Sequence, residues 1–217
     1  MKPFIKICCI ASREEARLAI SAGASAIGLV SAMPSGPGPI ADSLIAEIAV
    51  GVPPPIATFL LTCRQDADSI IEQHAVCRTS TLQLVDSVPP AELGKLRARL
   101  PGIRLVQVIH VGDEESIDEA RVAAPHVDAL LLDSGNQKLA VKELGGTGRV
   151  HDWRISRRIR DAVDVPLFLA GGLNAGNVAA AVAAVQPHGV DVCSGLRTEG
   201  RLDAAKVRAF VAALSAG

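Results

Sequence analysis

The segments VPLFLAGGLN (165–174) and HGVDVCSG (188–195) do most to decide the fold class. Each starts with a short apolar run, as a buried strand does, and ends in small residues where a helix is expected to follow. A Gly-Gly or Ser-Gly pair at that place is often only a tight turn. Two such turns in succession, Gly171-Gly172 and Ser194-Gly195, also bring backbone N–H groups together, and we interpret them as a phosphate site.

The same alternation of apolar run and amphipathic helix extends back to the N-terminus. The predicted strands are 3–9, 25–31, 55–61, 79–85, 103–110, 127–132, 165–169 and 188–193. These eight units, of about 27 residues each, follow one another without a linker. An open, doubly wound sheet is the alternative, but it normally has fewer strands. We therefore predict an α/β fold of the (β/α)8 or TIM-barrel class, with residues 1–217 as a single domain.

Several helix ends are marked by residues that favour them. Ser12 is a predicted N-cap with Glu15 at the capping-box position, and Gly23 is expected to end that helix. Further predicted N-caps are Asp113 and Asn174. Two connections are unusually long, 32–40 and 133–151, the second with a Gly145-Gly146-Thr147-Gly148 cluster. Both follow strands, at the barrel face that carries active sites, and we interpret them as candidate lids.

Composition and charge limit the class of partner. The chain of 217 residues has a formal net charge of -1; 49% of its residues are hydrophobic, and only 2% are aromatic. Acids and bases are spread evenly, so the sequence predicts neither a nucleic-acid partner nor an anionic membrane surface. The N-terminus lacks a signal-peptide pattern, and no apolar run reaches the ~18 residues of a membrane span. We expect a cytoplasmic protein that binds a small molecule.

The five cysteines do not have the pattern of a disulfide framework or a zinc site. Cys63, Cys77 and Cys193 stand mostly in apolar surroundings and are predicted to be small buried side chains. Since no metal-ligand spacing occurs among the His, Cys and acidic residues, we predict no bound metal. Nothing in the sequence indicates an organic cofactor.

Polar residues at strand ends are the candidates for chemistry. Cys8 ends the first predicted strand and Asp133 follows the sixth, so a thiol and a carboxyl group could act on opposite sides of a bound sugar as base and acid. The alternatives are a core thiol and a turn-capping acid. Asp191 lies in the last strand and needs a partner, such as backbone N–H groups or Lys6, which shares the face of Cys8. His110 ends the fifth strand and is a weaker candidate.

Motifs along nearly the whole chain resemble the phosphoribosylanthranilate isomerase family, barrel enzymes of tryptophan biosynthesis. Lys6-Ile7-Cys8 followed by Ile10 is similar to the family's opening Lys-Ile-Cys-Gly-Ile. The other matching stretches are Ala22-Gly23-Ala24 before Ile27-Gly28, Leu82-Gln83-Leu84, Leu131-Leu132-Asp133-Ser134, Gly145-Gly146-Thr147-Gly148 with Asp152-Trp153, Ala170-Gly171-Gly172-Leu173-Asn174 with Asn177-Val178, and Gly189-Val190-Asp191-Val192 with Ser194-Gly195.

This resemblance implies an Amadori rearrangement, which turns an N-linked phosphoribosyl aminoaldose into an aminoketose without a cofactor. It implies that Asp133 is the general acid that protonates the ribose ring oxygen, and that Cys8 is the base that takes the proton from C2 of the resulting Schiff base. The residues expected to bind the substrate or its phosphate are Lys6, Gln83, Gly171, Gly172, Asp191, Ser194 and Gly195.

The sequence departs from the family pattern at three places, of which the first concerns the anthranilate half of the substrate. The family's Ser-Pro-Arg, whose arginine binds the anthranilate carboxylate, is replaced by the arginine-free segment 35–39. Val85 stands at the family's histidine, and Cys9 at the glycine after the cysteine. Arg64, Arg149 and Lys138 are candidate substitutes for the arginine. Two alternatives therefore stay open: a diverged isomerase of another sugar phosphate, and a non-catalytic barrel that binds a phosphorylated ligand.

Overall fold

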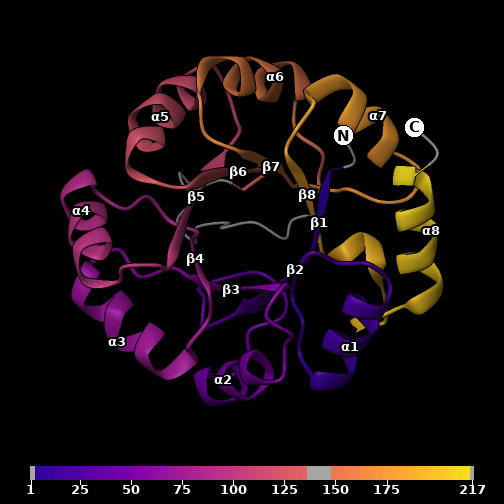
Figure 1. Cartoon of the computed structure of the whole chain (residues 1–217). Coiled ribbons are helices and arrows are strands. Elements are labelled where there is room, and N and C mark those ends of the chain that lie inside the picture. Colours follow the sequence, from indigo (N-terminus) through magenta and orange to yellow (C-terminus); the bar gives the residue numbers. More distant parts are fainter. Residues whose placement is uncertain (1–2, 136–147, 216–217) are drawn as a thin grey trace.

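Eight parallel strands close into a barrel with the helices outside it (Figure 1). The computed structural model describes residues 3–135 and 148–215. The barrel strands are β1 (Phe4–Ile7), β2 (Ala26–Val30), β3 (Ala57–Thr62), β4 (Thr81–Leu84), β5 (Arg104–His110), β6 (Ala129–Asp133), β7 (Leu167–Leu169) and β8 (Gly189–Val192). The α-helices are α1 (Arg13–Ser21), α2 (Asp42–Val50), α3 (Ala67–Cys77), α4 (Pro90–Arg99), α5 (Glu115–Ala123), α6 (Trp153–Ala162), α7 (Val178–Val185) and α8 (Ala204–Ser215).

The closure of the sheet confirms the predicted barrel and excludes the open sheet. Lys6 of β1 pairs with Ala26 of β2 on one side and with Asp191 of β8 on the other. All eight predicted strands are present in the predicted order, although each is shorter than predicted, because apolar residues continue into the connections. Within the described residues, no helix is long and apolar enough to cross a membrane.

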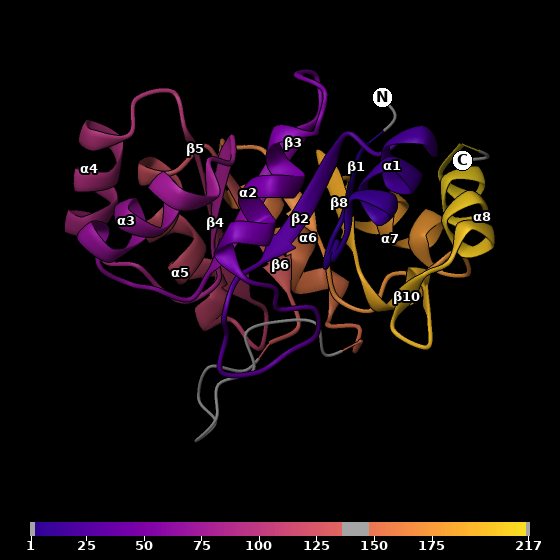
Figure 2. The ribbon, with the colours of Figure 1, turned by 90° about the horizontal axis from the view of Figure 1, so that it is seen from below.

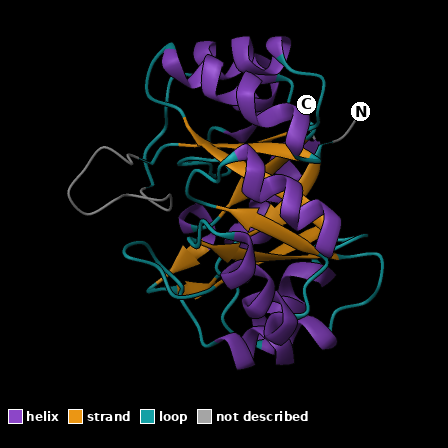
Figure 3. Ribbon diagram, turned by 90° about the vertical axis from the view of Figure 1, so that its left-hand side faces the viewer, coloured by secondary structure: helices purple, strands orange, loops and turns teal. Residues whose placement is uncertain are grey.

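Each strand separates two apolar layers, as Figure 3 indicates by the strands enclosed between helices. Side chains such as Ile5 and Ile7 of β1 point outward and pack under the helices in one large cluster. Side chains that alternate with these outward ones point into the barrel, as Lys6 of β1 and Phe59 of β3 do. Near-continuous apolar strands are expected when both faces of a parallel sheet are covered.

Helix ends agree with the predictions in part. The hydroxyl of Ser12 accepts a hydrogen bond from Glu15 N, and Gly23 has a left-handed φ of 100° just after α1, as predicted. Asp113 accepts a hydrogen bond from Glu115 N, one residue before the assigned cap of α5. Asn174 is not the N-cap of α7: its side chain closes a turn by accepting a hydrogen bond from Gly176 N, and the helix begins only at Val178.

A partly buried ion pair connects the last unit of the barrel to the first. After β8 the chain forms a 3-10 turn, η2 (Ser194–Leu196), and a short hairpin of β9 (Arg197–Thr198) and β10 (Arg201–Leu202). Arg197 donates to Glu15 of α1 at 2.9 and 3.1 Å. In the side view of Figure 2, this hairpin and the connection after β2 lie at the same end of the barrel.

Candidate active site

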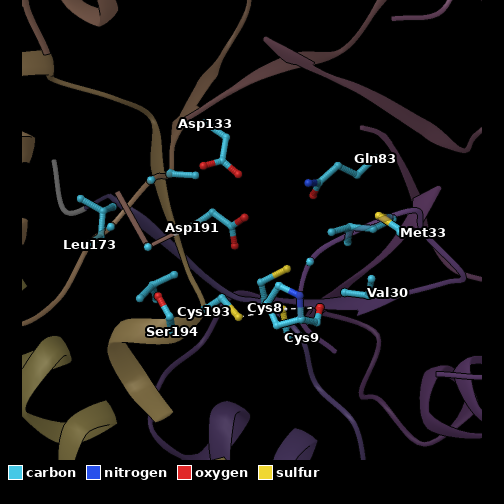
Figure 4. Close-up of a pocket in the computed structure, with 18 of the residues that line it drawn as sticks. Cys8, Cys9, Val30, Met33, Gln83, Asp133, Leu173, Asp191, Cys193 and Ser194 are labelled. Carbon is cyan, nitrogen blue, oxygen red and sulfur yellow. Dashed lines mark hydrogen bonds between the residues drawn. The ribbon is translucent and has the colours of Figure 1, made fainter. Parts of the chain in front are cut away.

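A pocket opens at the carboxyl ends of the strands, where this fold builds its active sites. Its empty volume is about 660 Å³, including the part open to solvent. Seven of the predicted site residues line it: Cys8, Gln83, Gly171, Gly172, Asp133, Asp191 and Ser194. Lys6 and Gly195 do not line it, because Lys6 lies in the barrel below the pocket and Gly195 is packed behind Ser194. Figure 4 shows the side chains around this space.

Cys8 follows β1 and has very little room around its sulfur. The residue is 5% exposed. An ideal Cβ placed on Gly28 of β2 would lie 2.7 Å from Cys8 Sγ and 3.1 Å from Lys6 Nζ. Gly28 is therefore needed for the position of both side chains. Its place in the family motif was noted from the sequence, but this packing role depends on the alignment of two strands.

Lys6 and Asp191 form a buried ion pair beneath Cys8. Lys6 Nζ lies 2.9 Å from Asp191 Oδ2, and Lys6 also lies over the ring of Phe59, 5.2 Å from its centroid. Burial opposes the charge of Lys6, but the charges of Asp191 and Cys8 outweigh it and raise the pKa of Lys6. Burial also raises the pKa of Asp191, and Lys6 only partly offsets this effect. Of the partners considered for the acid, backbone N–H groups or Lys6, the structure pairs Asp191 with Lys6.

Polar atoms converge on the pocket from β4, β6 and β8. Asp133 Oδ1 accepts a hydrogen bond of 2.7 Å from Ser134 N, which fixes the carboxyl group at the end of β6. Gln83 Oε1 and Asp191 Oδ1 are buried and have no hydrogen-bond partner in the described part of the chain. In Figure 4 the side chains of Asp133, Gln83 and Asp191 point toward one shared space. Such unsatisfied acceptors in a pocket are typical of a site that binds a polar ligand.

One end of the pocket has the backbone geometry of an anion site. Gly171 and Gly172 both have left-handed φ angles, 83° and 62°. A Cβ on Gly172 would lie 2.8 Å from the carbonyl carbon of Arg149, and one on Gly195 would lie 2.1 Å from Leu173 O. The approach of Gly195 to Leu173 holds the two turns against each other, and that of Gly172 packs the first turn against the segment at Arg149. Ser194 lies beside them in the pocket wall. The sequence prediction that α7 starts directly at this turn was wrong, and the anion would face loop and 3-10 backbone instead.

The opposite end of the pocket is mostly apolar. Val30, Met33, Leu61 and Pro37 contribute to its lining. Val85, at the family's histidine position, is 1% exposed. The imidazole next to Val85 belongs to His110 at the end of β5, whose Nε2 lies 2.8 Å from Val85 O.

Of the candidate substitutes for the missing arginine, the two that the structure describes, Arg64 and Arg149, do not line this pocket. Arg64 instead donates a hydrogen bond of 2.7 Å to Ser69 O at the start of α3. Arg149 contacts the phosphate turn through its backbone, next to Gly171 and Gly172. Lys138 lies outside the described residues, as does most of the predicted lid 133–151, including Gly145, Gly146 and Thr147.

Two thiols of the pocket were missed in the sequence. Cys9 and Cys193 both line it, and their sulfur atoms lie 2.7 Å apart. The prediction that Cys63 and Cys193 are buried was wrong, since both are partly exposed, while Cys77 is buried as predicted. A signal existed for Cys193: it stands two residues after Asp191 and so shares its inward face. Among the described residues, no group of three or more His, Cys, Asp and Glu is placed to hold a metal ion.

Comparisons with known proteins agree with this geometry. A family model described as N-(5'phosphoribosyl)anthranilate (PRA) isomerase matches residues 5–213. The chain is 35% identical over 208 residues to the N-(5'-phosphoribosyl)anthranilate isomerase of Methanocella arvoryzae, with 95% of each chain covered. It is 36% identical over 211 residues to that of Haloferax volcanii, with 96% of this chain and 91% of the relative covered.

Solved structures of such enzymes have the same fold. The phosphoribosyl anthranilate isomerase of Thermotoga maritima superposes with a TM-score of 0.84 at 26% identity, covering 99% of this chain and all of the other. A second structure, 24% identical with a TM-score of 0.82 and the same coverage, is a complex with reduced 1-(o-carboxyphenylamino)-1-deoxyribulose 5-phosphate. On the family match and the two relatives, the chain belongs to the N-(5'-phosphoribosyl)anthranilate isomerase family.

Proposed function

We propose that Cys8 and Asp133 are the base and the acid of an Amadori rearrangement in this pocket. Family membership makes the isomerisation of phosphoribosylanthranilate, a step of tryptophan biosynthesis, the activity of this chain. The observation that carries the proposed roles is that both side chains line one pocket, at the carboxyl ends of the separate strands β1 and β6, beside the glycine-rich turns of the proposed anion site.

The two groups act in sequence on the sugar. Asp133 donates a proton to the ribose ring oxygen, the C1–O bond breaks, and the nitrogen lone pair forms a Schiff base with C1. The Cys8 thiolate then removes the proton from C2, and the electron pair of that C–H bond gives an enolamine. Transfer of a proton back to C1 and loss of the hydroxyl proton at C2 complete the aminoketose, so that no atom is gained or lost overall.

Lys6 places a positive charge beneath the proposed base, Cys8. A thiol acts as a base only as thiolate, and a nearby ammonium group stabilises the thiolate. Lys6 Nζ and Cys8 Sγ both lie against Gly28, and the charge of Cys8 is among the causes that raise the pKa of Lys6. Asp191 in turn keeps Lys6 charged at the barrel axis. Its free Oδ1 and Gln83 Oε1 are then available to hydroxyl groups of the open-chain sugar.

The two ends of the substrate fit the two ends of the pocket. The phosphate would accept hydrogen bonds from backbone N–H groups at Gly171 and Gly172 and around Ser194 and Gly195. The aromatic ring would lie at the apolar end, against Met33 and its neighbours. This end has no arginine in the 32–40 connection, so we expect the ring to be held more by apolar contact than by a carboxylate clamp. As a biosynthetic enzyme, it is expected to work in the cytoplasm.

Turnover of the purified protein tests this function. The protein is expected to convert phosphoribosylanthranilate and to restore growth of a tryptophan auxotroph that lacks the isomerase. If neither occurs although the folded protein binds the reduced substrate analogue, the non-catalytic binder would be the correct alternative. If other phosphorylated aminoaldoses react faster than phosphoribosylanthranilate, the aglycone assignment is wrong and the acid–base assignment stands.

A further inference from the structure

The pocket wall contains a pair of thiols that the proposed mechanism does not use. Cys9 Sγ and Cys193 Sγ lie 2.7 Å apart, as the dashed line in Figure 4 marks. A disulfide bond has an S–S length of about 2.0 Å, so the two sulfur atoms need to approach by less than about 1 Å to form one. Both cysteines are free in the structure.

The backbone holds these two residues next to each other. Cys8 N donates a hydrogen bond of 2.9 Å to Val192 O, so the chain segments that lead to Cys9 and Cys193 are paired. Arg197 donates to the carbonyl oxygens of Cys8 and Cys9, just beyond the end of β1. The contact between the two sulfurs is therefore set by the strands and by Arg197, and does not depend on a surface loop.

The two thiols differ in a way that suits oxidation. Hydrogen bonding with Cys9 and the charge of Arg197 lower the pKa of Cys193, although burial opposes them. The same hydrogen bond, together with Cys8 and burial, raises the pKa of Cys9. Cys193 is also partly exposed, whereas Cys9 is only 6% exposed. Cys193 is thus the thiol suited to react first with an oxidant, and Cys9 is the thiol suited to react next with the oxidised Cys193.

We propose that Cys9 and Cys193 are a redox modification site, which hydroperoxides oxidise to an intramolecular disulfide in the wall of the substrate pocket. The Cys193 thiolate attacks one oxygen of hydrogen peroxide, and the O–O bond breaks to give a sulfenic acid and, after protonation, water. Cys9 then attacks the sulfenic sulfur and displaces a second water. Two thiols lose two electrons and two protons in total, and one peroxide is reduced to two waters.

The disulfide connects two parts of the site that the ligand uses. Cys9 contacts the connection after β2, because its sulfur lies 3.6 Å from Pro37 O and its Cβ lies against Gly38. Cys193 immediately precedes Ser194 in the phosphate turn, and Cys9 immediately follows Cys8. Drawing the two sulfurs together moves both neighbours, so oxidation is expected to lower turnover and a dithiol reductant to restore it.

Counting thiols after peroxide treatment tests the site without relying on turnover. The folded protein is treated with hydrogen peroxide, quenched, unfolded and alkylated, and its peptides are mapped. The alkylated thiols are expected to fall from the five of the reduced chain to three, with Cys9 linked to Cys193, and to return to five with dithiothreitol. Turnover measured on the same samples is expected to fall in proportion to the linked fraction.

Matched variants separate this pair from the other cysteines. Cys63→Ser and Cys8→Ser are each expected to lose two thiols on oxidation, whereas Cys193→Ser and Cys9→Gly are expected to form no link. Glycine suits position 9, because φ is 60° there. An unchanged count of five, a link that uses Cys8, or the same link rate in Cys9→Gly would overturn the proposal. A linked protein with full turnover would overturn its effect on the pocket, while a failed isomerase assay would leave the thiol count valid.

Discussion

Replacing Asp191 by asparagine removes one charge of the buried pair and keeps the size of the side chain. Lys6 is 0% exposed, and its ammonium group lies 2.9 Å from the carboxylate. With an effective dielectric constant of about 20, this separation gives an attraction of about 6 kcal/mol before the cost of burying the charges is subtracted. Asp191→Asn removes the attraction but leaves the cost of burying the Lys6 ammonium group.

We expect Asp191→Asn to lower the free energy of unfolding by about 3–5 kcal/mol, the range for a buried pair that loses one partner. The double variant Lys6→Met/Asp191→Asn is expected to be more stable than Asp191→Asn, because no ammonium group is then left alone in the barrel. Asp161→Asn is the matched control: its pair with Arg157 has a separation of 2.8 Å but is exposed, so stability is expected to stay nearly unchanged.

Urea unfolding followed by circular dichroism measures these three variants and the single variant Lys6→Met on one scale. The reasoning is refuted if Asp191→Asn is as stable as Asp161→Asn. It is also refuted if the double variant loses the sum of the two single losses, because the charges would then not be coupled.

Three further predictions concern the pocket and the barrel closure. Gly28→Ala places a methyl group 2.7 Å from Cys8 Sγ, and kcat is expected to fall about 100-fold; unchanged kcat would contradict the packing argument. Gly172→Ala forces a φ of 62° on alanine, and the Kd for inorganic phosphate is expected to rise while kcat/KM falls. Glu15→Gln is expected to lower the free energy of unfolding by ~1–2 kcal/mol at pH 7. This value is toward the lower end of the range for hydrogen bonds to charged groups, because part of the carboxylate meets solvent. Burial raises the pKa of Glu15, but Arg197 and two backbone N–H groups outweigh it, so that the pKa is lowered in the folded protein. The stability that Glu15 contributes is therefore present above pH 4.5 and is lost as the pH falls through the lower folded pKa. Urea unfolding at a series of pH values measures it, and a difference between Glu15→Gln and wild type that persists in acid would contradict the prediction.

Periodicity and strand ends were enough to predict the barrel. Strands buried on both faces appear as apolar runs such as 127–132, and their count of eight decided between closure and an open sheet. The sequence also predicted that Asp191 needs a partner, because a carboxylate among apolar residues requires one, and Lys6 was one of the two kinds of partner considered. Both inferences depend on local rules, so they did not need the position of distant residues.

Predictions failed where two local rules compete or where distant residues meet. Asn174 and Asn177 can both cap a helix, and the turn closed by Asn174 leaves the start of α7 to the later residue. The contact of Cys9 with Cys193 joins opposite ends of the chain, 184 residues apart, and depends on the closure of the barrel. The missing arginine was evident in the sequence, but the apolar surface around Met33 appears only in the folded pocket.

The most direct test of the proposed acid–base pair measures turnover and ligand affinity in the same variants. Cys8→Ala and Asp133→Asn are each expected to lower kcat for phosphoribosylanthranilate by about 100-fold or more, the usual contribution of a positioned acid or base. The Kd of the reduced aminoketose phosphate is expected to stay within a few-fold of the wild-type value, since the phosphate turns are intact, and Cys63→Ala is expected to behave as wild type. A Cys8→Ala or Asp133→Asn enzyme with wild-type kcat would contradict the assignment, and so would a loss of turnover fully explained by lost binding.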